Sequence, residues 1–341
     1  MNAKTTKKLS IPARIAGSLA LPVIMYVAMM ALCFANGKTY YGSAQMWQTL
    51  IVDIGLSVTC AMGIGLQFKC GRFDFSGGGI MLLSAIVAGN VAYNMGNNVL
   101  VMAVLAMTMC VVLSLLVALL YVYGRIPVNI TTIGAAMLYE AITCIIFKGE
   151  GIRLFSNMTL RVFSTFPYVL IPACGGIAVY AFFSYFTVTG KEAALLSKNR
   201  QAAVNIGINE KKNVILTYLY SGIIFGFATM IYITNGTHGA SFVALGTVGE
   251  LFSNILPVFI GLYVGTFCGD TLGTIIGSFS LCLMSYSLSA VFSNEIGSSI
   301  SSIFTGVFVI LVNVIGVHGG NIGNWLKKSF FPKQAVSAAE K

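Results

Sequence analysis

Apolar runs of membrane-spanning length alternate with short polar breaks along the whole chain. A bilayer core about 30 Å thick needs roughly 20 apolar residues in a helix. The pattern predicts about ten transmembrane helices, at residues 14–35, 46–66, 76–94, 99–123, 128–147, 166–187, 214–234, 247–266, 271–291 and 298–317. The chain is therefore expected to be an all-α polytopic membrane protein. The fifth and eighth spans are rich in polar or small residues, so we expect these two to be broken or partly re-entrant.

Composition supports this fold class. Of the 341 residues, 57% are hydrophobic and 9% are charged, whereas a soluble domain carries about 25% charged residues. A sizeable soluble domain is therefore excluded. The eight cysteines lie in or beside apolar runs without a C-x-x-C pair, which is typical of small buried hydrophobic residues.

The distribution of Lys and Arg predicts the orientation in the membrane. With the N-terminus inside, sixteen of the twenty basic residues fall on the cytoplasmic side. The four on the outer side are Lys38, Lys148, Arg153 and Arg161. This asymmetry follows the positive-inside rule and requires an even number of spans. The net charge of +10 is thus explained by topology, and we expect no nucleic-acid partner.

These expectations divide the chain into three parts. Residues 1–13 form a cytoplasmic N-terminus, residues 14–317 a transmembrane domain, and residues 318–341 a cytoplasmic tail. The domain would lie in the cell membrane with both termini inside. The longest outer loop, residues 148–165, is a candidate landing site for an extracellular partner; the alternative is a plain connector.

The central polar loop, residues 188–213, interrupts the apolar pattern most strongly and holds five basic residues. Asn199 can cap a short helix at residues 200–206, and Gly207 can end it. A capped helix between two spans offers a surface that a soluble partner could grip. The alternative is a solvated linker that only maintains topology.

The pattern Asn199-x-x-Ala202-Ala203-x-x-x-Gly207-Ile208 resembles the coupling loop in permease subunits of ribose-type ABC importers. In that family this loop docks on a separate ATPase. The resemblance implies that the two alanines form a small surface that enters a cleft of the ATPase, while the glycine allows a sharp exit.

A second stretch, residues 71–79, resembles the family's G-G-I-D-L-S-x-G signature through Gly71, Asp74, Ser76 and Gly78. Arg72 stands where the family has a second glycine. Asp74 and Ser76 can cap the third helix, and the glycines allow close helix packing. We therefore favour a structural role for this turn over substrate contact.

A third stretch, at the start of the fifth span, resembles the family's P-x-I-x-T-L-G segment through Pro127, Ile130, Thr132 and Gly134. Asn129 is polar where relatives are apolar. An unpaired amide in hydrocarbon is costly. Asn129 and Thr132 are therefore expected either to line a water-filled path or to form hydrogen bonds between helices.

Glycines recur every four residues near the ninth span, at Gly261, Gly265, Gly269, Gly273 and Gly277. One helix face made of glycine predicts tight helix packing. The run at residues 272–277 resembles the family's L-G-T-L-L-G segment, although the glycine doublets before it are replaced. The chain is identified as a diverged member of the family.

Two acids lie inside predicted spans, Asp53 in the second and Glu140 in the fifth. Intramembrane acids are rare and often functional. They are candidates to line a hydrophilic path. They also support an alternative function, a secondary transporter driven by an ion gradient, and a non-transporting membrane scaffold is a third possibility.

The chain has no P-loop, H-E-x-x-H or G-x-S-x-G motif and no Cys/His cluster. We therefore expect no enzyme activity, metal or cofactor in this chain. The family resemblance, from about residue 51 to residue 319, implies an ABC importer for a sugar or sugar-like neutral solute. The implied partners are an ATP-binding subunit, an extracytoplasmic solute-binding protein and a second permease copy in the bilayer.

Overall fold

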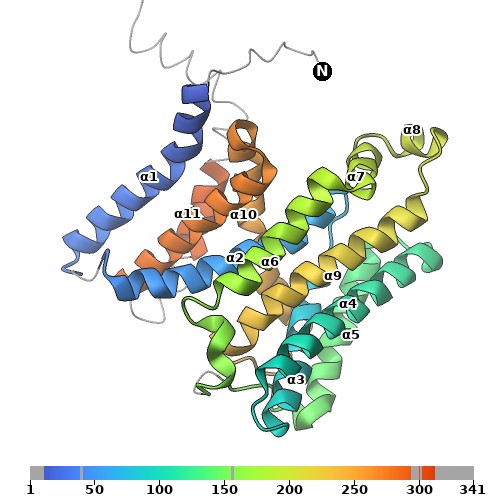
Figure 1. The fold of residues 1–341 in the computed structure, drawn as a ribbon, viewed down its shortest axis with the longest axis horizontal. Helices are drawn as coiled ribbons and strands as arrows, with labels where there is room; N and C mark the ends of the chain where they lie inside the picture. Colours follow the sequence, from blue (N-terminus) through green and yellow to red (C-terminus); the bar gives the residue numbers. More distant parts are fainter. Residues whose placement is uncertain (1–10, 39–40, 155–156, 293–298, 300–301, 312–341) are drawn as a thin grey trace, which may run out of the picture.

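The computed structural model describes residues 11–38, 41–154, 157–292, 299 and 302–311, and this part of the chain is almost entirely helical (Figure 1). Eight of its helices are long and apolar enough to span a membrane. They are α1 (Ile11–Ala35), α2 (Ala44–Lys69), α3 (Gly77–Asn94), α4 (Val99–Gly124), α5 (Val128–Ile145), α9 (Glu210–Asn235), α10 (Gly246–Cys268) and α11 (Asp270–Val291). The all-α polytopic fold class is thereby confirmed.

The sixth predicted span is bent. Helix α6 (Leu170–Ala181) continues through a π-helical turn, Phe182–Phe186, and meets α7 (Val188–Lys198) at 71°. The Thr187 hydroxyl donates to the Phe183 carbonyl (2.7 Å) and accepts from the Gly190 amide (3.0 Å), so it ends one helix and caps the next. The break therefore falls here, whereas the fifth and eighth spans, where it was expected, are each a single helix, α5 and α10.

Nine of the ten predicted spans thus correspond to described helices when the bent pair counts as one span. For the tenth, the structure describes a short apolar helix, Ser302–Leu311. The rest of that span, most of the predicted N-terminal segment and the predicted tail lie outside the described residues.

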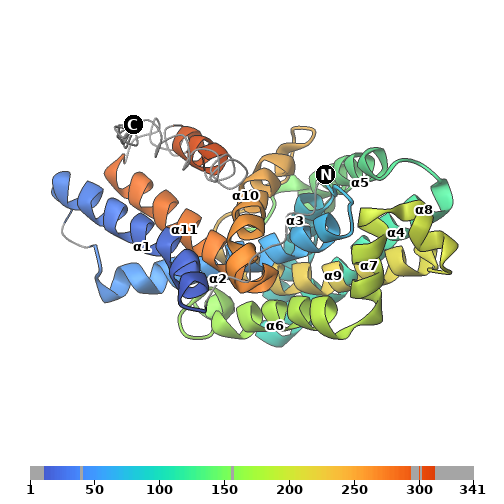
Figure 2. The same ribbon diagram turned by 90° about the horizontal axis from the view of Figure 1, so that it is seen from above.

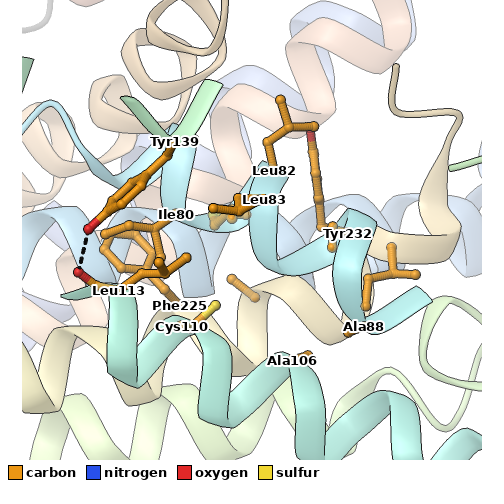
Figure 3. Close-up of a cluster of buried hydrophobic side chains, with 14 of the residues drawn as sticks. Ile80, Leu82, Leu83, Ala88, Ala106, Cys110, Leu113, Tyr139, Phe225 and Tyr232 are labelled. Carbon is orange, nitrogen blue, oxygen red and sulfur yellow. Dashed lines mark hydrogen bonds between the residues drawn. The ribbon is translucent and has the colours of Figure 1, made fainter. Parts of the chain in front are cut away.

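Helix α2 occupies the centre of the bundle and packs against α6, α9, α10 and α11 (Figures 1 and 2). Within its apolar window 72% of the residues are buried, against 11% for the peripheral α1. The main core lies between α3, α4 and α9, where the Tyr139 hydroxyl of α5 donates to the Leu113 carbonyl of α4 (2.9 Å) (Figure 3). The side chains of this core are apolar and pack against one another. Such van der Waals packing holds membrane helices together, because lipid tails leave no hydrophobic driving force for their association.

Glycine controls the approach of α10 to α11. A Cβ atom on Gly273 would overlap the Gly261 carbonyl oxygen and lie 2.7 Å from the Gly265 nitrogen. A Cβ on Gly277 would lie 2.6 Å from the Pro257 carbonyl oxygen. The two backbones are therefore in direct contact, as the spacing of four residues implies, while Gly269 forms the turn between the helices with φ +94°.

The replacement Gly273→Ala should lower stability by about 1–3 kcal/mol, because the backbone atoms it meets cannot move aside without separating the helices. The matched control is Gly134→Ala in α5, where an added Cβ meets nothing within 4 Å. Thermal unfolding of the two variants in detergent should show a lower midpoint for Gly273→Ala alone. Equal midpoints would contradict the packing argument.

Candidate functional site

The short helix predicted in the central loop is present as α8 (Arg200–Asn205). The Asn199 side chain accepts from the Ala202 amide (3.1 Å) and so caps its start. The Ile208 amide returns to the Ala203 carbonyl (3.2 Å) across Gly207, whose φ of +94° is rare for other residues. The loop therefore closes on itself as a compact projection at one end of the bundle, here called the α8 end (Figure 1).

The two alanines of α8 point in different directions. Ala202 is exposed, whereas Ala203 is only 3% exposed and faces the protein. The exposed apolar side chains at the tip are Val204 and Ile206, the latter 72% exposed. The exposed apolar surface of the projection is thus made by Ala202, Val204 and Ile206 instead of the expected alanine pair.

Polar contacts tie the projection to the bundle. The Arg200 Nε lies 2.8 Å from the Glu210 Oε1 at the start of α9, and this partner raises the pKa of Arg200. The Asn213 amide group of α9 donates to the Thr189 carbonyl of α7 (2.9 Å). Helices α7 and α8 would therefore move together with the start of α9.

The turn between α2 and α3 lies directly beneath α7. Gly71 has φ +72°, and a Cβ atom there would lie 3.1 Å from the Cβ of Ser197. The buried Asp74 Oδ1 accepts from the Ser76 amide (2.7 Å) and hydroxyl (2.6 Å). The Ser76 side chain makes no hydrogen bond to the first turn of α3, and Asp74 bonds to Ser76 itself. The two residues therefore do not cap α3, although the sequence predicted that they would. Asp74 instead fixes the turn against which α7 rests.

Arg72 fits this turn by folding back into the protein. It is 7% exposed, its Nε donates to the Gln67 Oε1 (3.1 Å), and its guanidinium lies 6.0 Å from the centre of the Tyr218 ring. Gly78, the second residue of α3, faces α10, where an added Cβ would lie 2.7 Å from the Thr247 carbonyl oxygen. The turn therefore remains tight although Arg72 replaces a glycine.

Lys69 joins three elements at the α8 end. Its Nζ lies 2.9 Å from the Asp270 Oδ2 at the start of α11 and 5.9 Å from the ring centres of both Tyr180 and Tyr185. The Thr271 hydroxyl also donates to the Tyr185 hydroxyl (3.3 Å). Tyr185 belongs to the π-helical turn that leads into α7. The position of α7 is therefore linked through Lys69 to the ends of α2 and α11.

A cavity of about 330 Å³, with both polar and apolar side chains in its wall, lies between α2, α10, α11 and the helix Ser302–Leu311. Asp53 of α2 lies at its wall, and Asp53 also borders a second hollow of about 430 Å³ against α11. Hydroxyl and amide groups line the cavity, from Ser57, Ser253, Asn254, Ser285, Ser302 and Thr305. Among the described residues that line the cavity there is no Lys, Arg or His. This part of the chain therefore offers the cavity hydrogen bonds and one carboxylate, but no cation.

A third cavity, of about 240 Å³, extends this space toward α3 and α9 and shares Leu56, Ser253 and Asn254 with the first. At its wall the Tyr232 hydroxyl donates to the Glu250 Oε2 (2.9 Å). Toward the α8 end, aromatic rings close the bundle. The ring of Phe68 lies 4.6 Å from that of Phe73 and 5.6 Å from that of Phe259 of α10, centre to centre.

Of the predicted path-lining residues, only Asp53 borders these cavities. The Thr132 hydroxyl donates to the Asn129 carbonyl of its own helix (3.2 Å), and the Thr132 side chain is fully buried. Asn129 is exposed at the α8 end of α5. The serines and Asn254 escaped sequence analysis because single small polar residues in a span also satisfy their own helix, as the Ser253 hydroxyl does with the Gly249 carbonyl.

Glu140 holds the start of α10. Its side chain is 1% exposed and accepts from the Leu245 amide (2.7 Å), the Thr247 amide (2.8 Å) and the Thr247 hydroxyl (2.6 Å). These amides lack partners within α10, so an acid at this helix start is favourable. Glu140 thus has a structural role here, and it does not border the described cavities.

Glu140→Gln should lower the free energy of unfolding by about 1–3 kcal/mol, because the amide group cannot accept all three bonds. Glu150→Gln, at an exposed position of the following loop, makes the same charge change and serves as control. Thermal unfolding of the purified variants measures the difference. A Glu140→Gln protein with unchanged stability but lost transport would instead favour a proton-carrying role.

The helical bundle with its bent sixth span defines a polytopic α-helical membrane protein. Residues 46–313 match the family model described as "Branched-chain amino acid transport system / permease component", and the chain belongs to this family. The chain is thus a permease subunit of the ABC transporter class, and the family implies that its partners are other components of an ABC transporter. No curated protein and no solved structure matches the chain.

Proposed function

We propose that this chain is the transmembrane subunit of an ABC importer for a neutral, hydroxyl-rich solute such as a sugar, driven by a separate ATP-binding subunit. The observation that carries the proposal is the cavity beside Asp53, whose polar lining consists of hydroxyl, amide and carboxylate groups without a cation. Sugar hydroxyls can donate to Asp53 and can both donate to and accept from the serines and Asn254.

The same lining argues against anionic and zwitterionic solutes. A sugar phosphate would bring a negative group next to Asp53, and the carboxylate of an amino acid, although its ammonium group could pair with Asp53, would find no positive side chain among the described lining residues. Burying an unpaired charge in such a site is costly. The family description names branched-chain amino acids. The lining of this cavity instead favours a sugar, the solute class that the resemblance to ribose-type importers implies.

The coupling step is proposed to act through α8. The exposed Ala202, Val204 and Ile206 would enter a cleft of the ATPase, and α7 would transmit the movement to the α2–α3 turn and to Lys69. Alternating access then requires that the aromatic closure at the α8 end opens while the Asp53 side closes. The α8 end would face the cytoplasm, as would both termini.

The opposite end offers a landing surface for an extracytoplasmic binding protein. The loop 148–165 is held in place by a two-way backbone pairing of Ile152 with His238 and by a hydrogen bond between Ser164 and Thr234 (2.8 Å). Beside it Phe242 and Val243 are 75% and 72% exposed. A second permease copy would complete the importer in the cell membrane.

Ile206→Glu and Ala202→Trp should each weaken the association with the ATP-binding subunit roughly tenfold or more, because they change the apolar tip of the projection. Lys191→Ala, an exposed position of α7, is the control. Co-purification and ATP-dependent uptake in proteoliposomes measure the effect. Ala203 is unsuitable for this test, since a bulky residue at a buried position would disturb folding.

Uptake that persists in proteoliposomes without any ATP-binding subunit, and that an ion gradient drives, would refute the importer proposal. That result would support the secondary transporter, with Asp53 as its remaining acidic candidate. The permease alone, inserted with the same lipid-to-protein ratio, is the required preparation.

Asn254→Leu and Ser285→Val should each lower the uptake of a neutral sugar roughly tenfold, because each removes hydrogen-bonding groups from the cavity wall. Thr108→Val, at an exposed position of α4 outside the cavity, should leave uptake unchanged. Radiolabelled neutral sugars, leucine and a sugar phosphate should be compared in the same assay. Uptake of leucine in place of any sugar would show that the assigned solute class is wrong.

A further inference from the structure

A further cavity, of about 550 Å³, opens at the α8 end between the last turn of α4, the α4–α5 connection, α8 and the first turn of α9. Three basic side chains line it, Arg125, Arg200 and Lys211. The one acid in the lining, Glu210, already pairs with Arg200 at 2.8 Å. The charges of Arg125 and Lys211 are thus not balanced by other lining residues, and the cavity attracts an anion.

The remaining wall is apolar or aromatic and consists of Tyr121, Val122, Ile126, Pro127 and Val214. The cavity therefore combines a cationic rim with an apolar wall. A small soluble anion would use only the rim, because it has no group that could cover the wall.

The apolar wall continues along α4 into the span. Leu119 of α4, three residues before the lining residue Val122 and on a neighbouring part of the helix surface, is 41% exposed, and the lining residue Tyr121 lies near the end of α4. Exposed leucines on a spanning helix are matched by hydrocarbon, and a tyrosine at the helix end suits the interface. An ATPase outside the membrane could reach the basic rim but could not cover this face of α4.

We infer that this cavity binds the headgroup of an anionic phospholipid. The phosphate lies between Arg125 and Lys211, and the acyl chains follow Val122 and Leu119 of α4. Arg125 ends α4 in a left-handed conformation, with φ +54°, which turns the chain toward the α4–α5 connection. The lipid would then contact α4, α5, α8 and α9 together, next to the proposed coupling helix.

The test uses the full-length permease and vesicles of phosphatidylcholine with or without phosphatidylglycerol. The double variant Arg125→Gln with Lys211→Gln should bind phosphatidylglycerol about 25-fold more weakly, at about fivefold for each cation lost. The control double variant, Lys191→Gln with Lys198→Gln, removes two exposed charges at the same end outside the cavity. Native mass spectrometry or a spin-labelled lipid measures the binding.

The control variant should bind like the unchanged protein, and binding of phosphatidylcholine should be equal in all three. Equal phosphatidylglycerol binding in the cavity variant and the control overturns the inference. If the cavity variant keeps the lipid but loses the ATP-binding subunit, the rim belongs to the protein partner instead. Displacement of the lipid by millimolar inorganic phosphate alone also overturns it, since the apolar wall would then contribute nothing. The proposed transport function does not depend on either result.

Discussion

Hydrocarbon offers no hydrogen-bond partner, and this constraint shapes the permease throughout. Helices satisfy their own backbone, so only their ends and breaks need outside partners. At the start of α10 the partner is Glu140, which comes from another helix. At the bend between α6 and α7 it is the Thr187 hydroxyl. Polar residues that seem out of place in an apolar sequence thus stabilise the points where helices begin or break.

The same constraint separates structural acids from those open to a solute. Glu140 and Asp74 accept several hydrogen bonds from backbone or hydroxyl groups and are buried. Asp53 instead borders a cavity together with serines and Asn254. A carboxylate that faces open polar space can exchange partners with a passing solute, whereas one that holds a helix start cannot do so without destabilising the fold.

The proposed coupling depends on a few close contacts at the α8 end. Gly71 touches Ser197, Lys69 meets Asp270, and both contacts adjoin the segment that carries α7. The Gly71 contact has no side chain on one partner, so movement there is not absorbed by a flexible group, whereas the Lys69 contact depends on charge attraction. The basic cavity beside Arg125 lies at the same end, where lipid headgroups and the proposed ATPase would both be within reach.

Much of this protein followed from the sequence. The length of the apolar runs predicted the spans, the Asn199 and Gly207 pattern predicted α8, and the glycine spacing predicted tight helix packing, because each of these signals is local along the chain. The sequence alone did not predict the break after α6, the role of Glu140 or the inward direction of Ala203. Those features depend on which side chain from a distant segment reaches a helix end or face, and only the packing of α5, α9 and α10 around α2 decides that.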